Sequence, residues 1–303
     1  MCLYPRIIRN PKYLPNKKNG GHVPKARDPR LLYVSIGCGK CIECRRQRAN
    51  NWKVRLSEEL ETNPNAMFVT LTFSEESLNW FKKSTNDENT IAKQAIRYFN
   101  ERWRKKYKKA PRHWLITELG HENTERLHLH GIIWGNEEQK QKLEALWKYG
   151  NIYIGEYVDK STINYIVKYV TKLDNDHPNF DGKIFASKGL GSGYNKKTTI
   201  NKYNGEETKE YYITKEGYKI ALPMYYRDKI YNDDEKEMLW LMKLDKKERY
   251  INGIKYPFKT REEKKKFIKA LTKAQKKNRE MGYSGTEWKT NKYLESLKKL
   301  KKS

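Results

Sequence analysis

The 303-residue sequence lacks several features that would assign it to other classes of protein. It has no run of some 18 apolar residues, so a hydrophobic membrane-spanning segment is not expected, and its first residues lack the apolar core of a signal peptide. No Gly-x-x-x-x-Gly-Lys-Ser/Thr sequence occurs, which excludes a built-in P-loop helicase. Acidic residues are scarce, with 37 Asp and Glu against 64 Lys and Arg. We therefore expect a soluble intracellular protein without a membrane partner.

The positive charge is concentrated at the two ends of the chain. Residues 1–60 contain 14 Lys and Arg against 4 acidic residues, and residues 243–303 contain 21 against 7. Basic ends around a nearly neutral centre suit a polyanion such as nucleic acid, because Lys and Arg displace the counterions of phosphate groups. A lysine-rich solvated surface is the alternative. The 22 Tyr and 8 Trp could stack on unpaired bases, although most such rings belong to hydrophobic cores.

Cysteine is rare, and three of the four cysteines lie together in Cys38-Gly-Lys-Cys41-Ile-Glu-Cys44. Inside a cell, this clustering favours metal binding over disulfide bonds. A tetrahedral zinc ion needs a fourth ligand, for which Cys2 is the first candidate and His22 the second. We predict a structural zinc site, with reduced free thiols as the alternative.

Hydrophobic periodicity predicts alternating strands and helices between residues 31 and 173. Strands are expected at 31–36, 68–73, 113–118, 127–134 and 152–158, and helices at 42–61, 88–107, 137–147 and 161–173. Ser161 is the expected N-cap of the last helix. From residue 67 onward, the order β-α-β-β-α-β-α begins with the split βαβ pattern. That pattern predicts an α+β, ferredoxin-like fold, an antiparallel sheet with helices on one face.

We expect three segments along the chain. A basic, cysteine-rich N-terminal segment covers residues 1–60, and a core that carries the motifs below covers 61–175. The third segment, 176–303, begins with a flexible glycine-rich loop at 189–193 and a hairpin at 210–221. Beyond Tyr225 the chain is lysine-rich, and we expect it to be mostly helical with a disordered tail at 298–302.

Two histidines are separated by one residue in Leu127-His128-Leu-His130. Residues i and i+2 of a strand share a face, so both imidazoles can approach one metal ion. A hairpin turn centred near Asn123 would place Glu118 opposite His128, with Cβ atoms about 5 Å apart. Two imidazoles and one carboxylate accept Mg, Mn or Zn and leave coordination positions open for a phosphate oxygen.

About 35 residues later, Tyr165 and Tyr169 are expected one turn apart on a helix. A phenol with a pKa of about 10 is a weak nucleophile at neutral pH and needs a nearby cation to favour the phenolate. Lys168 and Lys172 each follow a tyrosine by three residues, so either could supply this charge or hold a phosphate. For each motif alone, an amphipathic helix or a satisfied histidine pair would suffice. Their co-occurrence in a basic chain favours the chemical interpretation.

In this order, His128-Leu-His130 followed by Tyr165-Ile-Val-Lys168-Tyr169 resembles the HUH endonucleases. Within them it is most similar to the two-tyrosine rolling-circle replication initiators of microviruses, especially gokushoviruses. The resemblance spans roughly residues 1–230 and includes the segments Cys38–Cys44, Phe68–Phe73 and Ala221–Tyr226. Related phage sequences often have proline before the first histidine. Leu127 stands here, on a position that a strand directs to the other face.

The resemblance implies metal-dependent transesterification at a single-stranded DNA origin, with a 5′-phosphotyrosyl link and a free 3′-OH as products. It implies that His128, His130 and Glu118 bind the catalytic Mg or Mn. It further implies that Tyr165 and Tyr169 are alternating nucleophiles, assisted by Lys168. Host helicase and polymerase would be partners, in the cytoplasm of a bacterial host cell.

Two other classes remain as alternatives. A metal-dependent hydrolase of the His-x-His barrel type would recruit further histidines at strand ends, and none of the other four falls at an expected strand end. A non-catalytic single-stranded nucleic-acid-binding protein would need aromatic pairs on the open face of the sheet, where we expect His128, His130 and Glu118.

Overall fold

The computed structural model describes residues 1–120, 125–155, 157–194, 203–204, 207–208, 210–214, 216–283 and 288–300. They form two compact units, one of residues 1–47 with 231–303 and one of residues 48–230. This division differs from the expected three segments, because the two ends of the chain pack with each other. For example, Gln275 Nε2 donates a hydrogen bond of 2.7 Å to the carbonyl of Leu3. The expected boundaries near residues 60 and 175 stay a prediction.

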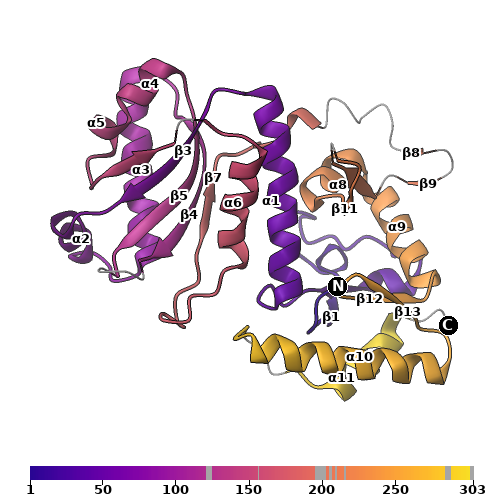
Figure 1. The fold of residues 1–303 in the computed structure, drawn as a ribbon. Helices are drawn as coiled ribbons and strands as arrows, with labels where there is room; N and C mark the ends of the chain where they lie inside the picture. Colours follow the sequence, from indigo (N-terminus) through magenta and orange to yellow (C-terminus); the bar gives the residue numbers. More distant parts are fainter. Residues whose placement is uncertain are drawn as a thin grey trace. The chain divides into compact units, whose positions relative to one another are not determined.

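The larger unit contains a five-stranded sheet in the order β6-β3-β5-β4-β7, in which all neighbours are antiparallel (Figure 1). Its strands are β3 (Ala66–Thr72), β4 (Arg112–Leu119), β5 (Leu127–Trp134), β6 (Ile152–Ile154) and β7 (Ile184–Ala186). The α+β class and the first four of these strands agree with the sequence prediction. The strand expected at 152–158 ends at Ile154, and β7 was not predicted.

The sheet is accompanied by helices that mostly match the predicted ranges. They are α1 (Ile42–Thr62), α2 (Glu75–Lys82), α3 (Glu88–Tyr107), α4 (Glu137–Gln141), α5 (Leu143–Trp147), α6 (Lys160–Thr171) and α8 (Met224–Ile230). The helix expected at 137–147 is divided at Lys142. The N-cap of α6 is Asp159 and not Ser161, because the Asp159 carboxylate accepts a 2.8 Å bond from the Thr162 amide.

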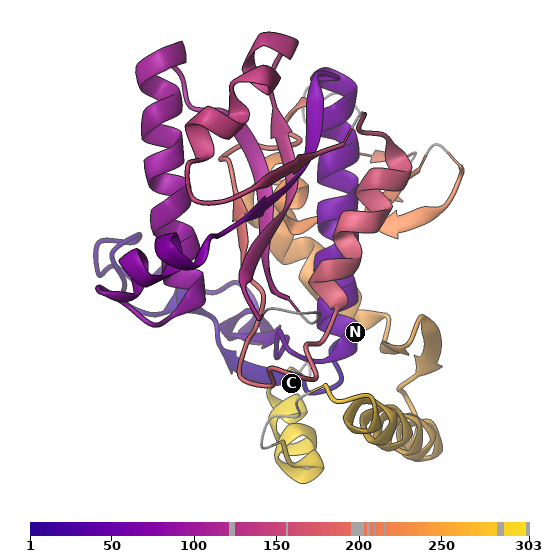
Figure 2. The same cartoon turned by 60° about the vertical axis from the view of Figure 1, so that its left-hand side comes forward.

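Helices cover both faces of the sheet, which corrects the prediction of helices on one face (Figures 1 and 2). Helices α3 and α5 pack on one face and α1 and α6 on the other. The reason is that β4 carries consecutive apolar residues, and Trp114, Leu115 and Ile116 are all at most 1% exposed. A strand that is apolar on both sides needs cover on both sides. The run in the sequence therefore contained this signal, and the split βαβ pattern alone does not.

The pairing of β4 with β5 places Glu118 opposite His128, as predicted. The turn expected around Asn123 lies outside the described residues, which stop at Gly120 and resume at 125. Gly131 of β5 is required by close backbone approach, since a Cβ there would lie 2.0 Å from the carbonyl oxygen of Trp114. This contact brings β5 close to β4 directly beside His130.

The glycine-rich segment at 189–193 is anchored to α1, in contrast to the flexible loop expected. Leu190 is fully buried, and the Gly191 amide donates a 2.7 Å hydrogen bond to the buried carboxylate of Glu59. Gly191 has φ +76°, and a Cβ there would lie 2.6 Å from the carbonyl oxygen of Arg55. Glu59 also accepts two hydrogen bonds from Arg112 on β4. The segment is therefore tied to the helix and to the sheet.

The predicted hairpin at 210–221 is present as the antiparallel pair β10 (Tyr211–Ile213) and β11 (Lys219–Ala221). Residue 215 of its expected turn lies outside the described residues. The short pair β8 (Tyr203–Asn204) and β9 (Glu207–Thr208) precedes it.

The smaller unit combines the first 47 residues with the C-terminal part. Its elements are η1 (Pro11–Tyr13), η2 (Pro29–Leu32) and η3 (Lys298–Leu300), the strands β1 (Arg6–Arg9), β2 (Tyr33–Ile36), β12 (Glu248–Ile251) and β13 (Ile254–Pro257), and the helices α9 (Asp233–Asp245), α10 (Arg261–Glu280) and α11 (Thr290–Leu297). The expected strand at 31–36 thus begins as a 3₁₀ turn. The expected disordered tail is ordered up to Leu300, whose side chain is buried, and residues 301–302 lie outside the described part.

Within the described part of the chain, none of the helices combines the length and the apolar character needed to cross a membrane.

Replacement of Leu129 by alanine should lower the free energy of unfolding of the larger unit by about 2–5 kcal/mol, because its side chain is fully buried between β5 and α3. The matched change Ile213→Ala, on a side chain that is 53% exposed, should alter it by less than about 0.5 kcal/mol. Urea unfolding followed by circular dichroism compares the two. Equal effects would contradict the core assignment of β5.

Candidate active site and metal centre

The two histidines of β5 lie on one face of the sheet, while Leu127 and Leu129 face the core beneath α3. The His130 Nε2 atom lies 2.8 Å from Glu118 Oε2, and both side chains are about nine-tenths buried, at 13% and 14% exposure. The Nδ1 atom of His130 lies 3.1 Å from the hydroxyl of Thr70 on β3. The imidazole is therefore held from both sides, by a carboxylate and a hydroxyl.

His128 lies farther from this carboxylate than the strand register suggests. The ring centroids of His128 and His130 are 6.3 Å apart, and the Glu118 side chain turns toward His130. Among the described residues, only the four cysteines form a group of three or more metal-ligand atoms within 4.8 Å of one another. Burial, together with the neighbouring His130, lowers the pKa of His128, which favours the neutral imidazole that a metal ion requires.

Helix α6 brings both tyrosines to this face of the sheet. The phenol oxygens of Tyr165 and Tyr169 are 2.7 Å apart, and the Tyr169 ring stacks on the His130 ring with centroids 4.7 Å apart and planes 9° from parallel. Tyr165 is 48% exposed. Burial, and then the hydrogen bond with Tyr165, raise the pKa of Tyr169, so this phenol is protonated in the absence of further positive charge.

The two lysines are not equivalent, although the sequence spacing treats them alike. Helix α6 ends at Thr171, and Lys172 leaves it with extended backbone, so that its ammonium group forms an ion pair with Glu118 Oε1. The ammonium also lies 5.8 Å from the centroid of the Tyr169 ring. Lys168 is exposed on the helix, with no side-chain partner among the described residues. Lys172, rather than Lys168, therefore reaches the cluster.

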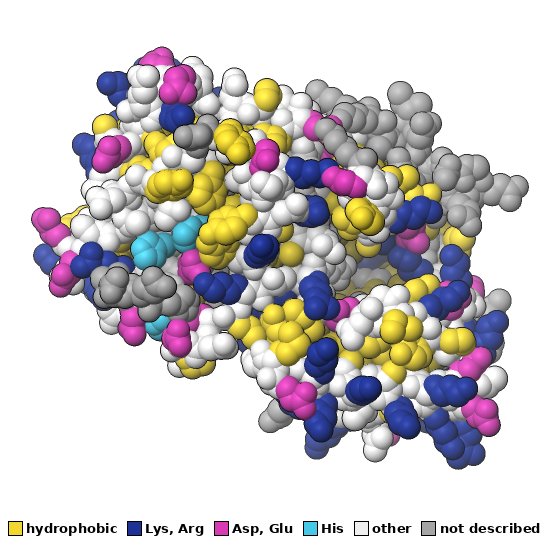
Figure 3. All heavy atoms as spheres, viewed as in Figure 1, with side chains coloured by type: hydrophobic (Ala, Val, Ile, Leu, Met, Phe, Trp, Pro, Cys, Tyr) yellow, Lys and Arg dark blue, Asp and Glu magenta, His cyan; other side chains and the backbone are white. Residues whose placement is uncertain are grey.

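Glu118 is ionised at this position. Burial raises its pKa, but hydrogen bonds and charge from His130 and Lys172 outweigh the burial, so that the net pKa is lowered. Its two oxygens serve different partners, Oε1 the ammonium and Oε2 the imidazole. Histidine side chains reach the surface here, beside hydrophobic and charged groups (Figure 3). A carboxylate, two imidazoles and two phenols thus line one accessible surface, which suits metal-assisted attack on a phosphate.

Thr70 and Phe68 are site residues that the sequence reasoning missed. Thr70 is paired with His130 across β3 and β5, and the Phe68 ring packs 6.0 Å from the Tyr165 ring. The alternating pattern of 68–73 predicted a strand there. It did not predict that this strand lies next to β5, because their pairing joins residues about 60 positions apart in the sequence.

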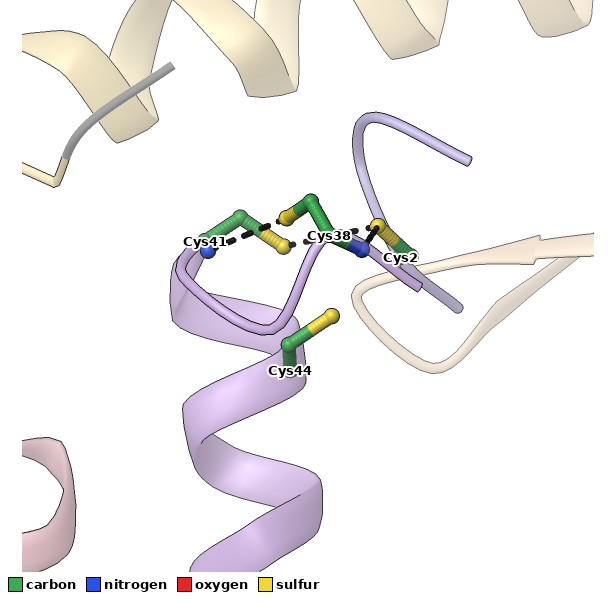
Figure 4. Close-up of side chains that lie close together, drawn as sticks. All are labelled: Cys2, Cys38, Cys41 and Cys44. Atoms are coloured by element: carbon green, nitrogen blue, oxygen red, sulfur yellow. Dashed lines mark hydrogen bonds between the residues drawn. The ribbon is translucent and has the colours of Figure 1, made fainter. Parts of the chain in front are cut away.

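In the smaller unit, the four cysteine side chains point toward one another (Figure 4). Cys41 and Cys44 lie at the start of α1, Cys38 in the preceding loop and Cys2 in the N-terminal segment. Their sulfur atoms all lie within 4.8 Å of one another, and those of Cys2 and Cys41 are 3.9 Å apart. Four zinc–sulfur bonds of about 2.3 Å would place the sulfurs about 3.8 Å apart. The cluster could therefore hold a metal ion such as zinc.

Backbone amides surround these sulfurs. The amides of Tyr4 and Cys38 donate to Cys2 Sγ at 3.2 and 3.1 Å, and the Cys41 amide donates to Cys38 Sγ at 3.3 Å. Hydrogen bonds from the Cys2 and Cys44 thiols lower the pKa of Cys41, so this buried sulfur ionises readily. The fourth position belongs to Cys2, the first of the two candidates, and His22 is not part of the group.

Comparison with known proteins agrees with this geometry. The family model of the replication-associated protein ORF2 matches residues 66–174, the stretch from β3 to just beyond α6. The chain is similar to the replication-associated protein VP4 of Bdellovibrio phage phiMH2K, with 25% identity over 220 residues, covering 65% of this chain and 68% of the relative. It is also similar to the replication-associated protein ORF2 of Spiroplasma virus 4, with 43% identity over 49 residues, covering 16% of this chain and 15% of that relative.

No solved structure matches the chain. The matched family segment contains Glu118, both histidines, both tyrosines and both lysines of the cluster, and it excludes the four cysteines. The chain is thus similar to phage replication-associated proteins in the part that carries the candidate active site.

Protein purified without added metal should contain close to one zinc ion per chain, and Cys41→Ser should remove it, because a three-sulfur site binds zinc much more weakly. Elemental analysis by mass spectrometry gives the ratio. The control His22→Ala should keep its zinc, since this exposed residue lies outside the cluster. Folded protein without zinc would contradict the prediction.

Proposed function

We propose that this chain is an HUH endonuclease that initiates rolling-circle replication of a bacteriophage by nicking single-stranded DNA at the origin. The observation that carries the proposal is the continuous cluster of Glu118, His130, Tyr169 and Tyr165, joined by contacts of 2.8 Å, a ring stack and a 2.7 Å hydrogen bond. The similarity to phage replication-associated proteins supports it. So does the strand order β6-β3-β5-β4, which is the order of a ferredoxin-like split βαβ sheet.

Glu118, His128 and His130 would hold the catalytic Mg or Mn. Their donor chemistry fits such an ion, since the set offers one carboxylate with a lowered pKa and one imidazole, His128, whose neutral form is favoured. If Nδ1–H of His130 donates to Thr70, its Nε2 lone pair is directed toward the side of Glu118. The bound ion would polarise the scissile phosphate for attack.

The reaction is a transesterification at phosphorus. The phenol oxygen of Tyr165 or Tyr169 attacks the scissile phosphate, a tyrosine O–P bond forms and the bond between phosphorus and the 3′ oxygen breaks. The phenol loses its proton and the departing 3′ oxygen gains one. The products are a 5′-phosphotyrosyl link and a free 3′-OH that primes synthesis, and the reverse attack by a 3′-OH rejoins the strand.

The lysines supply positive charge near the phenols. Because burial raises the pKa of Tyr169, formation of its phenolate needs stabilisation, and the Lys172 ammonium beside its ring provides it. Lys168 is exposed next to Tyr165 along the helix and is free to contact a DNA phosphate. We assign Lys172 to the phenolate and to Glu118, and Lys168 to the substrate.

The proposed reaction places the protein inside the bacterial host cell. Its partners would be the single-stranded origin and host proteins that supply unwinding and synthesis, a helicase and a polymerase, since the sequence contains no P-loop motif.

Simultaneous replacement of His128 and His130 by alanine should reduce covalent protein–DNA adducts at least about 100-fold, because the divalent ion that stabilises the developing charge is lost. The assay incubates protein and Mn²⁺ with a randomised single-stranded DNA library and measures adducts on denaturing gels. The control His22→Ala should react as the wild type does. Undiminished adducts in the double variant would overturn the ligand assignment, whereas DNA binding without any wild-type adduct would favour the non-catalytic alternative.

Each single change, Tyr165→Phe or Tyr169→Phe, should leave some adduct formation, because one phenol remains beside the metal ligands. The double change should abolish it, while Tyr218→Phe, on a tyrosine that is 71% exposed in another hairpin, should have no effect. Mass spectrometry of the DNA-linked peptide identifies the attachment point. A link to any residue other than these two would refute the mechanism.

A further inference from the structure

A row of aromatic rings continues outward from the proposed nucleophiles to the edge of the sheet. The Tyr165 ring contacts the Phe68 ring of β3 edge to face, with centroids 6.0 Å apart. Phe68 in turn contacts Tyr153 of β6 with centroids 6.3 Å apart. With the contacts of Tyr169 to His130 and to Tyr165, five rings form an unbroken series. Nothing in the proposed chemistry uses its outer end.

The outer rings of this series are open to solvent. Tyr153 is 63% exposed and lies on β6, the strand at one end of the sheet. It is paired with Thr70, which is paired with His130, so Tyr153 stands on the face of the candidate active site, two strands from it. Neighbouring strands lie about 4.8 Å apart, which puts the Cα atoms of Tyr153 and His130 roughly 10 Å apart.

Gly155 leaves the Phe68 ring uncovered. A Cβ at this position would lie 3.3 Å from both Cβ and Cδ1 of Phe68, so any larger side chain would crowd against the ring. The backbone of Gly155 is tied to the same residue, since its amide donates a 3.0 Å hydrogen bond to the Phe68 carbonyl. A small residue at the end of β6 therefore preserves an accessible ring between Tyr153 and Tyr165.

Exposed aromatic rings beside a cationic side chain match the chemistry of unpaired nucleotides. A base has an aromatic face for stacking, and its phosphate favours a nearby cation such as the exposed Lys168, one helical turn after Tyr165. A protein partner would use an apolar surface instead, and each of these tyrosines carries a hydroxyl at its solvent end. The basic composition of the chain, with a net charge of +27, also suits DNA.

We propose that Tyr153 and Phe68 form a base-stacking subsite for single-stranded DNA next to the scissile phosphate. This inference rests on the proposed function for the identity of the substrate. The subsite takes unpaired bases of any sequence, because stacking requires only the face of the base. It aligns the strand between the sheet edge and the tyrosines, so Tyr153 is a positioning residue and takes no part in bond making.

The test separates bases from phosphates. Two labelled probes of about 12 nucleotides are used, an oligo-dT and an abasic oligonucleotide with the same sugar–phosphate backbone. Binding is measured by fluorescence anisotropy in the Tyr165→Phe/Tyr169→Phe background, which keeps both rings and prevents cleavage. In this background, the protein should bind oligo-dT more tightly than the abasic probe.

Tyr153→Ala should weaken oligo-dT binding by about 5-fold to 100-fold and leave abasic binding nearly unchanged. Tyr153→Phe should restore the affinity, because it keeps the ring. The control Trp80→Ala removes a ring that is 54% exposed on α2, which belongs to the opposite layer of the sheet, and should change neither affinity. Gly155→Val should weaken oligo-dT binding in the same direction as Tyr153→Ala.

Equal losses for both probes in Tyr153→Ala, or no loss, would overturn the stacking subsite. As a second readout, 5-iodouracil in place of thymine should crosslink to Tyr153 or Phe68 on irradiation, and crosslinks elsewhere only would also overturn it. Failure of the proposed function is distinguished by the wild-type adduct assay. If no adduct forms but the ratio of oligo-dT to abasic affinity depends on Tyr153, the subsite stands and the nicking activity does not.

Discussion

The antiparallel pairing of β4 with β5 determines where every group of the candidate active site lies. It sets Glu118 opposite His128 and Ile116 opposite His130. A shift of one residue would turn the histidines toward the core beneath α3 and expose Leu127 and Leu129 instead. The loss of buried apolar surface would oppose such a shift, and the close approach of Gly131 to the Trp114 carbonyl leaves no room for a side chain at that point. Packing on the far side of the sheet thus holds the catalytic face in register.

The features that the sequence predicted well depend on short separations along the chain. The register of the β4–β5 hairpin follows from one turn, the spacing of the two tyrosines from one helical turn and the cysteine group from a compact motif. Each is a local periodicity that reads the same in any fold. Even the choice of Cys2 over His22 followed from ligand chemistry, although it joins positions 36 residues or more apart.

The features that it missed depend on contacts between distant segments. The support of His130 by Thr70 requires the pairing of β3 with β5, and the role of Lys172 depends on where α6 ends. Helices on both faces follow from the packing of α1 and α6 against the sheet. The association of residues 1–47 with the C-terminal helices rests on buried polar contacts such as that between the Ile42 amide and Asn278 Oδ1. Tertiary contacts of this kind leave no periodic trace in one sequence.

The 2.7 Å hydrogen bond between the phenols of Tyr165 and Tyr169 has a consequence for their charge states. When one phenol loses its proton, the other can donate its own proton to the resulting anion and stabilise it. Two phenolates at that distance would repel each other strongly, at roughly 6 kcal/mol for an effective dielectric constant of about 20. The pair therefore favours a single negative charge that either oxygen can carry. Coupled ionisation of this kind makes readiness in one tyrosine incompatible with readiness in its neighbour.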